Sequence, residues 1–426
     1  MTSNIVLLTI DALRADHLSC YQYERRTTPF IDSLAEDSVL FENAYSASSH
    51  TREAVPSLLT GLYPDEATGD NFTCGRDTVA TYLSEICSTG GFHSNPYVSR
   101  AYGFDRDFDA FDDDLHLGQH RVFALIQRAL DKFMFNRGAY HARAEDINER
   151  SLAWLDSLPD DEPFLLWNHY MDVHGPYNPP EEYNEWGKSV TNSEAQELYD
   201  KISGDRDVTD DEIASARNLY DGEIAYIDAQ IKSIFSELNN RGLLEDSVVI
   251  VTADHGDLFG EHGKFAHPRY VYQELTRIPL LLWTPDTEKV RVDAACSIID
   301  ILPTILDWVK SESAYLPGRS LFNYESFDPN RIVFSTARGV GNDRNLRRVA
   351  ANQNKCSYLL EYNLSDGSVR NEQRAGEVSN GTVTDWGTLR EEALSFLETF
   401  TETKGESDDQ KINEEIEQRL DSLGYK

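Results

Sequence analysis

Two uninterrupted runs of apolar residues each end at an acidic residue. The first covers residues 4–10 and ends at Asp11, and the second covers residues 248–253 and ends at Asp254 and His255. Such runs, rich in β-branched residues, are typical of strands buried on both faces of a sheet. Because the ligand crevice of an open α/β sheet lies beyond the carboxyl ends of its strands, the pattern predicts a functional site where these two strands end.

Further strands and helices follow from the same kind of pattern. Residues 39–45 and 164–170 predict two more strands, one helix is expected to begin at Pro29, and another near Thr209. The hydroxyl-rich stretch 46–51 runs into a third helix, whose first backbone N–H groups suit an anion. An ordinary Ser/Thr cap is the alternative interpretation of that stretch.

Three regions depart from this alternation of strands and helices. Residues 121–135 have apolar positions at helical spacing and a locally basic side, which predicts a helix that either covers the sheet or forms a lid over an anionic substrate. Residues 189–208, rich in Asp, Ser and Gly, predict a surface loop. Near the C-terminus, residues 331–335 and 355–362 predict an antiparallel hairpin array, followed by an acidic helical tail from Thr388.

The charge narrows the class of partner. The 426 residues include 74 acidic and 39 basic side chains, which gives a formal charge of −35. A polyphosphate would be repelled, so nucleic acid is excluded as a default partner. An acidic, Lys-poor surface is typical of a halophilic protein, because concentrated salt screens its self-repulsion to within ~3 Å at about 1 M. An acidic surface without a salt requirement is the alternative.

Targeting signals and cysteine motifs do not stand out. No basic-then-apolar leader precedes the first strand, and no apolar run approaches the ~20 residues that span a bilayer, so we expect a cytoplasmic protein without a membrane span. The five cysteines are odd in number and form no CxxC pair. This favours buried thiols over a disulfide framework or a zinc site.

Several motifs, taken in order, resemble those of the sulfatase family, which belongs to the alkaline phosphatase superfamily. They are the segments 11–17, 27–35, 56–64, 174–177, 220–228, 253–257, 260–267, 299–306 and 317–321. The resemblance covers residues 1–325 and implies an alkaline-phosphatase-like three-layer α/β/α catalytic domain with a mixed central sheet. Residues 326–426 resemble the small C-terminal α+β unit, with an antiparallel sheet, that packs beside the catalytic domain in sulfatases.

The resemblance implies a metal site. In sulfatases an early Asp and a late Asp-His or Asp-Asn pair bind one divalent cation, which corresponds here to Asp11, Asp254 and His255. Oxygen-rich donors with one imidazole suit Ca²⁺, Mg²⁺ or Mn²⁺ better than zinc. Such an ion would hold one oxygen of the ester and lower the pKa of the nucleophile. Taken alone, Asp254 could also be a helix cap.

The expected nucleophile differs from the family pattern. Sulfatases have a Cys or Ser, oxidised to formylglycine, nine residues before the Thr of a Thr-Gly pair, and counting back from Thr60 gives Thr51. Glu53 and Val55 replace the Pro and Arg of that motif. A threonine cannot form the aldehyde, so a covalent threonyl intermediate is expected. For the same reason, a phosphate ester is favoured over a sulfate ester as the expected substrate. Ser49 is the alternative nucleophile if the loop has shifted by two residues, and loss of activity is the third possibility.

Proton donors and cations are expected in two segments. By family likeness His174, just past a predicted strand, protonates the leaving alkoxide, a contribution of ~10²–10⁴ in rate. His267 and Lys264 follow the late Asp-His pair in a Gly-rich loop, where they can stabilise a developing oxyanion. Arg14 and Arg52 are weaker candidates that can equally pair with surface acids.

These residues together predict a metal-dependent hydrolase of sulfate or phosphate esters, phosphodiesters included, acting on a small molecule or a glycan. One alternative is a transferase that passes a phosphoryl or phosphoethanolamine group to an alcohol. The other is a catalytically inactive binding protein. Transfer rather than release would indicate the first, and cation binding without turnover would indicate the second.

Overall fold

The core of the protein is a mixed eight-stranded sheet. The computed structural model describes residues 3–69, 71–114, 141–204, 207–311, 315–376 and 385–402. The strand order is β12-β2-β11-β7-β1-β6-β4-β5. The bounds are β1 (Asn4–Ile10), β2 (Val39–Phe41), β4 (Ser88–His93), β5 (Ala110–Asp112), β6 (Phe164–Tyr170), β7 (Ser247–Ala253), β11 (Leu280–Trp283) and β12 (Val290–Val292). Strand β1 pairs in parallel with β6 and β7, whereas β11 is antiparallel to β7 and β2, so the predicted mixed sheet is confirmed.

Strand β1 lies in the middle of this sheet, and all of its residues are buried. Its last residue, Ile10, pairs with Tyr170 of β6 and with Ala253 of β7. Three neighbouring strands therefore end level with one another. The residues that follow them, among them Asp11 and Asp254, leave the sheet at one edge, which is where the sequence pattern predicts a site.

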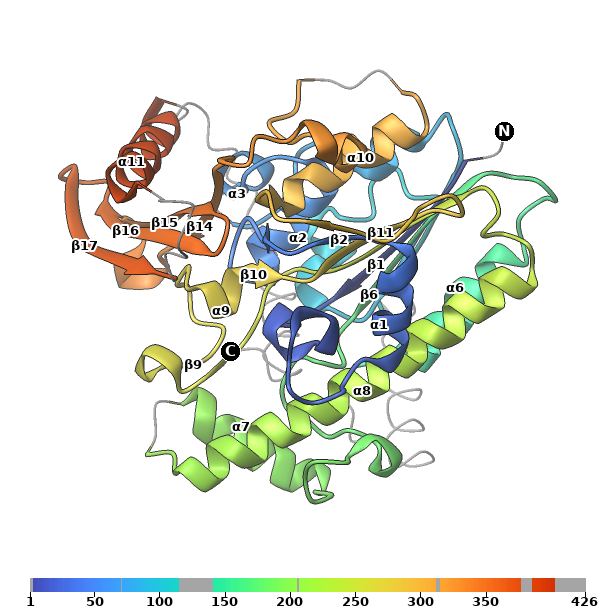
Figure 1. The fold of residues 1–426 in the computed structure, drawn as a ribbon, viewed down its shortest axis with the longest axis horizontal. Coiled ribbons are helices and arrows are strands. Elements are labelled where there is room, and N and C mark those ends of the chain that lie inside the picture. The colour runs from blue at the N-terminus through green and yellow to red at the C-terminus, as the bar shows by residue number, and fades with distance from the viewer. Residues whose placement is uncertain are drawn as a thin grey trace.

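Helices cover both faces of the sheet. Figure 1 shows α1 (Pro29–Leu34), α6 (Ala144–Leu155) and α8 (Asp210–Asn240) along one face, and α2 (Thr51–Thr60) and α10 (Ile301–Trp308) along the other. Shorter helices are α3 (Pro64–Ala67), α4 (Val79–Leu83) and α9 (Gln273–Thr276). This arrangement confirms the predicted three-layer α/β/α architecture.

The long helix α8 begins where the sequence predicts. The Thr209 hydroxyl accepts a hydrogen bond from the backbone N–H of Glu212, and the Glu212 carboxylate accepts one from the backbone N–H of Thr209. This reciprocal capping box satisfies N–H groups that a helix start otherwise leaves unpaired. The buried stripe that packs the helix onto the sheet recurs every three or four residues and consists of Leu219, Tyr220, Ile224, Ile227, Ile231 and Ile234.

Asp228, on α8, makes the stability of the fold depend on pH. It accepts hydrogen bonds from the backbone N–H groups of Phe30 (2.9 Å) and Ile31 (2.8 Å) in the first turn of α1. Burial raises the pKa of Asp228 to about 6. The folded chain therefore prefers the neutral carboxyl. The contribution of Asp228 to the free energy of unfolding is fully present below about pH 4 and is lost as the pH rises through about 6.

We therefore expect Asp228→Asn to gain stability relative to the wild type as the pH rises from about 4 to 8, by up to ~3 kcal/mol. Urea unfolding of both proteins at each pH measures the difference. Asp211→Asn, which changes an exposed acid of the same helix, is the matched control and is expected to give a constant difference. A pH-independent difference for Asp228→Asn would contradict the expectation.

A second sheet and a helix form the C-terminal part. The antiparallel order β14-β15-β16-β17 joins β14 (Val333–Arg338), β15 (Leu346–Gln353), β16 (Cys356–Asn363) and β17 (Ser368–Ala375). Helix α11 (Trp386–Glu402) lies across it, with Leu389, Ala393 and Leu397 packed against Val349 and Leu360 (Figure 1). The hairpin array is confirmed, and so is the helix at the start of the predicted tail, whereas the tail beyond residue 402 lies outside the described residues. There are two smaller sheets among the described residues. One has the order β10 (Arg277–Ile278), β3 (Ala44–Tyr45) and β13 (Cys296–Ser297), and the other pairs β8 (Leu258–Phe259) with β9 (Phe265–Ala266).

Two predictions about local structure are wrong. Residues 189–208 are not a loop, because α7 (Asn192–Ser203) occupies most of them. Thr191 and Glu194 form a capping box there, and Ala195 and Ile202 are buried, so capping and a narrow apolar stripe outweigh the polar composition. Residues 39–45 form two short strands in different sheets rather than one strand. The predicted helix at 121–135 lies outside the described residues.

The prediction for the cysteines is confirmed, since all five are buried and none forms a disulfide. Among the helices that the structure describes, none combines the length and the apolar character that a membrane crossing requires. The cellular location stays a prediction.

Candidate active site

The three metal ligands predicted from the sequence lie together. Asp11, Asp254 and His255 are fully buried at the carboxyl ends of β1 and β7. Nε2 of His255 is 3.5 Å from Oδ1 of Asp11 and 3.6 Å from Oδ2 of Asp254. Oδ1 of Asp254 accepts hydrogen bonds from the backbone N–H groups of Ala12 (3.2 Å) and His255 (2.8 Å), which hold this carboxylate in place.

His169, on β6, joins this cluster although no role was predicted for it. Its Nε2 is 3.5 Å from Oδ2 of Asp11. Asp11, His169 and Asp254 can each offer one ligand atom, a carboxylate oxygen or a ring nitrogen, and these three atoms lie within 4.8 Å of one another. The only sequence signal was a polar pair, Asn168-His169, inside an otherwise apolar strand. That signal does not tell which side chain faces the neighbouring strand end.

The unpartnered atoms of the cluster fit a divalent cation. Among the described residues, Oδ1 of Asp11, Oδ2 of Asp254 and Nε2 of His169 are buried and have no hydrogen-bond partner. Buried carboxylate oxygens are costly without a compensating positive charge. Burial, together with the charge of Asp11, raises the pKa of Asp254, as expected for two acids that share a site. A doubly charged ion between these donors would remove that cost.

Thr51 is the first residue of α2 and faces the same cluster. Its Oγ1 lies 3.0 Å from Nε2 of His255 and 3.4 Å from Oδ2 of Asp11, and the side chain is buried. Ser49, the alternative nucleophile, instead directs its hydroxyl to the backbone carbonyl of Pro268 at 3.5 Å. The structure thus brings Thr51, and not Ser49, against the acidic cluster.

Two further histidines lie beside the cluster. The ring centroid of His267 is 4.9 Å from that of His255 and 4.8 Å from that of His174. Nδ1 of His267 is 2.9 Å from Oδ1 of Asp257, whose other oxygen accepts a hydrogen bond from the Tyr177 hydroxyl. Asp257 was not predicted as a site residue, although it ends the same Asp-His-Gly-Asp motif.

The two histidines differ in their preference for charge. Burial lowers the pKa of His174. Burial also opposes the charge on His267, but the hydrogen bond and the negative charge of Asp257 raise the pKa of His267 above its usual value. Neighbouring groups with pKa values shifted in opposite directions can divide acid and base roles between them.

The predicted cations are placed differently. Lys264 has its Nζ 4.4 Å from the centroid of the Tyr270 ring, so its described contact is with an aromatic face rather than with the acidic cluster. Arg14 is buried and donates hydrogen bonds to both carboxylate oxygens of Asp16 and to Glu261. Its guanidinium is therefore engaged by acids, which was one of the two possibilities that the sequence left open.

Arg52 directly follows Thr51 and lies among aromatic rings. Its guanidinium carbon is 3.9 Å from the centroid of the Tyr97 ring and 5.5 Å from that of Phe72. Its Nε is buried and has no hydrogen-bond partner among the described residues. Arg269 and Arg338 approach the same Phe72 ring, and a concentration of positive charge therefore lies close to the start of α2.

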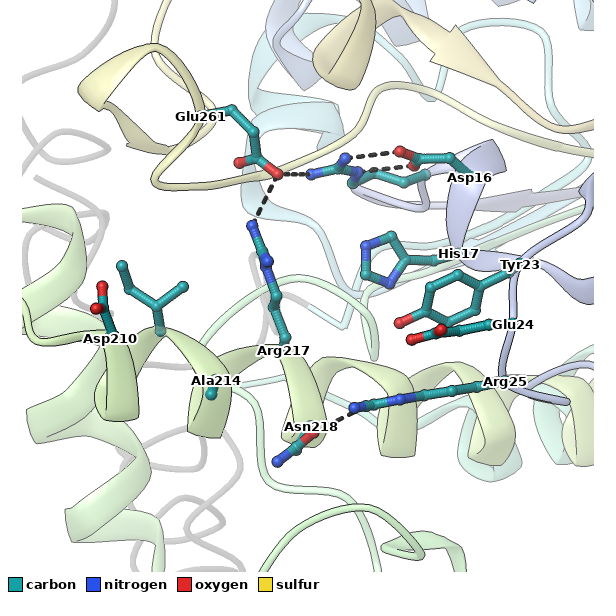
Figure 2. A pocket seen from close by; sticks show the side chains of 12 residues that line it. Asp16, His17, Tyr23, Glu24, Arg25, Asp210, Ala214, Arg217, Asn218 and Glu261 are labelled. Atoms are coloured by element: carbon teal, nitrogen blue, oxygen red, sulfur yellow. Dashed lines mark hydrogen bonds and ion pairs between the residues drawn. The ribbon is translucent and has the colours of Figure 1, made fainter.

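A separate cavity of about 480 Å³ lies behind Arg14, between the turn at Asp16 and the first turns of α8. Figure 2 shows its charged lining, in which Glu261 bridges Arg14 and Arg217, while Arg25 donates to Asn218. The residues that line it do not include Thr51 or any member of the acidic cluster. The cavity and the acidic cluster at the strand ends are therefore formed by different residues.

Known proteins match most of the length of this chain. A family model described as Sulfatase matches residues 3–311. The uncharacterized sulfatase YidJ of Escherichia coli (strain K12) is similar to this chain, with 26% identity over 352 residues that cover 75% of this chain and 70% of that protein.

Solved structures share the fold. The phosphonate monoester hydrolase of Agrobacterium radiobacter superposes with a TM-score of 0.68 at 18% identity and covers 93% of this chain and 95% of its own. A protein solved in complex with its substrate D-glucosamine-2-N,6-O-disulfate superposes with a TM-score of 0.67 at 16% identity, over 96% of this chain and 100% of its own. The alkaline-phosphatase-like fold predicted from the sequence is confirmed by these neighbours.

Proposed function

Because the chain belongs to the sulfatase family of ester hydrolases, we propose that it cleaves a sulfate or phosphate ester by attack of Thr51 on the central sulfur or phosphorus atom. The observation that carries the proposal is the position of the Thr51 hydroxyl, 3.0 Å from His255 and 3.4 Å from Asp11, at the first residue of α2. An anionic ester at this place also meets the first backbone N–H groups of that helix.

Asp11, Asp254 and His255 are proposed to hold one divalent cation. Nδ1 of His255 is 2.9 Å from the carbonyl oxygen of Gly256, a contact that places the ring proton on Nδ1 and leaves the Nε2 lone pair facing the carboxylates. When bound, such an ion supplies Lewis acidity toward the ester and favours the ionised nucleophile. The sequence suggested Ca²⁺, Mg²⁺ or Mn²⁺.

The chain's own side chains would carry the protons. The Thr51 hydroxyl gives up its proton to solvent, Oγ1 forms the new bond to sulfur or phosphorus, and the ester oxygen leaves with the bonding electron pair. His174 is the proposed proton donor to that oxygen. Because burial disfavours a charged His174, the proton would come from His267, whose charged form is supported by Asp257. Water then opens the threonyl ester, releases the acid and restores Thr51.

The substrate is proposed to be a small-molecule or glycan ester. Arg52, next to Thr51 and with an unpartnered Nε, is suited to a further anionic group on the substrate. Because a threonine cannot become an aldehyde, Thr51 favours a phosphorus ester over a sulfate ester as the substrate. One structural neighbour is a phosphonate monoester hydrolase, which agrees with that preference. Another neighbour was solved with a sulfated sugar as its substrate, so the substrates tested should include both elements.

The test is a panel of nitrophenyl sulfate, phosphate monoester, phosphate diester and phosphonate, assayed with and without a chelator. High salt is used because the −35 charge suggests a halophilic protein, which stays a prediction. We expect hydrolysis of at least one ester, loss of more than about 90% of it on chelation, and recovery with added divalent ion. Hydrolysis that persists in chelator would overturn the proposed metal role. Transfer of the phosphoryl-linked group to an added alcohol would indicate the alternative transferase. Cation binding without turnover of any ester would indicate the catalytically inactive binding protein.

A further inference from the structure

The side chain of His169 is fixed by hydrogen bonds on the side away from the acidic cluster. Its Nδ1 lies 2.9 Å from Oγ1 of Thr9 on the neighbouring strand β1. The same Oγ1 accepts a hydrogen bond from the indole N–H of Trp167 (3.1 Å) and donates one to the carbonyl oxygen of Asn168 (3.3 Å). A hydroxyl has one proton and two lone pairs, so its remaining lone pair is available to His169.

This arrangement is compatible with a ring proton on Nδ1 of His169. In that tautomer the Thr9 hydroxyl donates to Asn168, Nδ1–H of His169 donates to Thr9, and Nε2 carries a lone pair. Metal-binding histidines in proteins are commonly oriented by such a hydrogen bond from the other ring nitrogen.

The Nε2 atom of His169 lies beside the two carboxylates, and both His169 and Asp11 are fully buried. Nε2 is 3.5 Å from Oδ2 of Asp11, which also accepts a hydrogen bond from Asn95, and one ligand atom of each of Asp11, His169 and Asp254 lies within 4.8 Å of the others. Nε2 of His169, Oδ1 of Asp11 and Oδ2 of Asp254 all lack a hydrogen bond in the part of the chain that the structure describes. A histidine that served only packing would not need to direct an unsatisfied nitrogen at two buried acids.

We propose that His169 is a fourth protein ligand of the cation, so that the site has two carboxylates and two imidazoles and prefers a first-row transition ion to Ca²⁺ or Mg²⁺. This inference rests on the proposed function, because it concerns the same ion. Ca²⁺ takes six to eight oxygen ligands and Mg²⁺ strongly favours oxygen, whereas imidazole suits ions such as Zn²⁺, Co²⁺ and Fe²⁺. Mn²⁺ is the one ion of the original three that stays compatible.

The test measures metal binding rather than turnover. The full-length protein is stripped with chelator and titrated with Co²⁺, whose visible absorption reports its coordination number and geometry, and with Zn²⁺, Ca²⁺ and Mg²⁺ in competition. The wild type is expected to bind Co²⁺ and Zn²⁺ at least about 100-fold more tightly than Ca²⁺. His169→Asn, which keeps an N–H toward Thr9 but has no atom at the Nε2 position, is expected to lose about 100-fold in Co²⁺ affinity and to change the Co²⁺ spectrum.

His262→Asn is the control, because His262 has its Nε2 3.1 Å from Glu274 and belongs to no ligand cluster in the described residues. It is expected to leave Co²⁺ affinity within about threefold of wild type. If His169→Asn does not fold, His169→Gln, with an amide near the Nε2 position, is expected to weaken Co²⁺ binding by about tenfold.

The outcomes separate this inference from the proposed function. The inference would be overturned by a folded His169 variant with unchanged Co²⁺ affinity and spectrum, or by a wild type that prefers Ca²⁺. In either case, chelator-sensitive hydrolysis by the wild type would leave the proposed function intact. Chelator-resistant hydrolysis would instead overturn the proposed metal role, and with it the premise of the inference.

Discussion

Thr51→Ala is expected to lower kcat for every substrate of the enzyme by about 10³-fold or more, because it removes the atom that forms the covalent bond. The Thr51 hydroxyl is buried against His255 and Asp11, whereas the Ser49 hydroxyl points to the Pro268 carbonyl. Single-turnover assays would measure the loss, and metal affinity measured on the same protein would show that the cation site persists.

Two further variants separate the nucleophile from its surroundings. Thr51→Ser keeps an attacking oxygen and is expected to retain activity within about 10- to 100-fold. Ser49→Ala, which alters a hydroxyl directed toward the Pro268 carbonyl, is expected to change kcat by less than about threefold. Wild-type activity in Thr51→Ala would refute the covalent threonyl mechanism, and loss of activity in Ser49→Ala alone would transfer the nucleophilic role to Ser49.

Glu53→Gln is expected to destabilise the folded protein by about 3–5 kcal/mol. The Glu53 carboxylate is fully buried, Arg338 donates to its Oε1 at 2.8 Å, and Arg269 pairs with its Oε2. Removing the negative charge leaves two buried guanidinium groups with an uncompensated charge, which costs more than the pair itself contributes. Equilibrium unfolding in urea at fixed salt would measure the change.

The matched control is Glu36→Gln, because Glu36 pairs with Lys289 at the exposed surface. Its expected effect is below about 1 kcal/mol. A loss for Glu53→Gln as small as that of the control would show that water or other groups compensate the two arginines. Glu53 ties α2 to β14 across 285 residues of sequence.

The strand ends could be predicted because their signals are local. Continuous apolar runs that stop at Asp11 and at Asp254 mark both strands and the residues that leave them, and parallel pairing of β1 with β7 brings those residues together. The start of α8 was predictable for the same reason, since a Thr and an acid three residues later form its cap.

The position of His169 beside the acidic cluster could not be predicted from the sequence. It depends on the register in which Thr9 pairs with His169, and on the direction in which that ring faces, and neither is visible in a run of residues. The pairing of Glu53 with Arg338 is equally non-local. The missed helix α7 is a different case, because its cap, Thr191 and Glu194, was a local signal that the polar composition obscured.

The central position of β1 has a consequence for biosynthesis. This strand is synthesised well before its partners, because Thr9 contacts His169 across 160 residues of sequence, and Ala12, just after the strand, contacts Asp254 across 242 residues. At a synthesis rate of ~5–20 residues per second, an apolar segment with both edges open waits on the order of ten seconds or longer for its partners. Nascent chains should therefore depend on chaperones during translation, and a truncated product ending before β7 should aggregate.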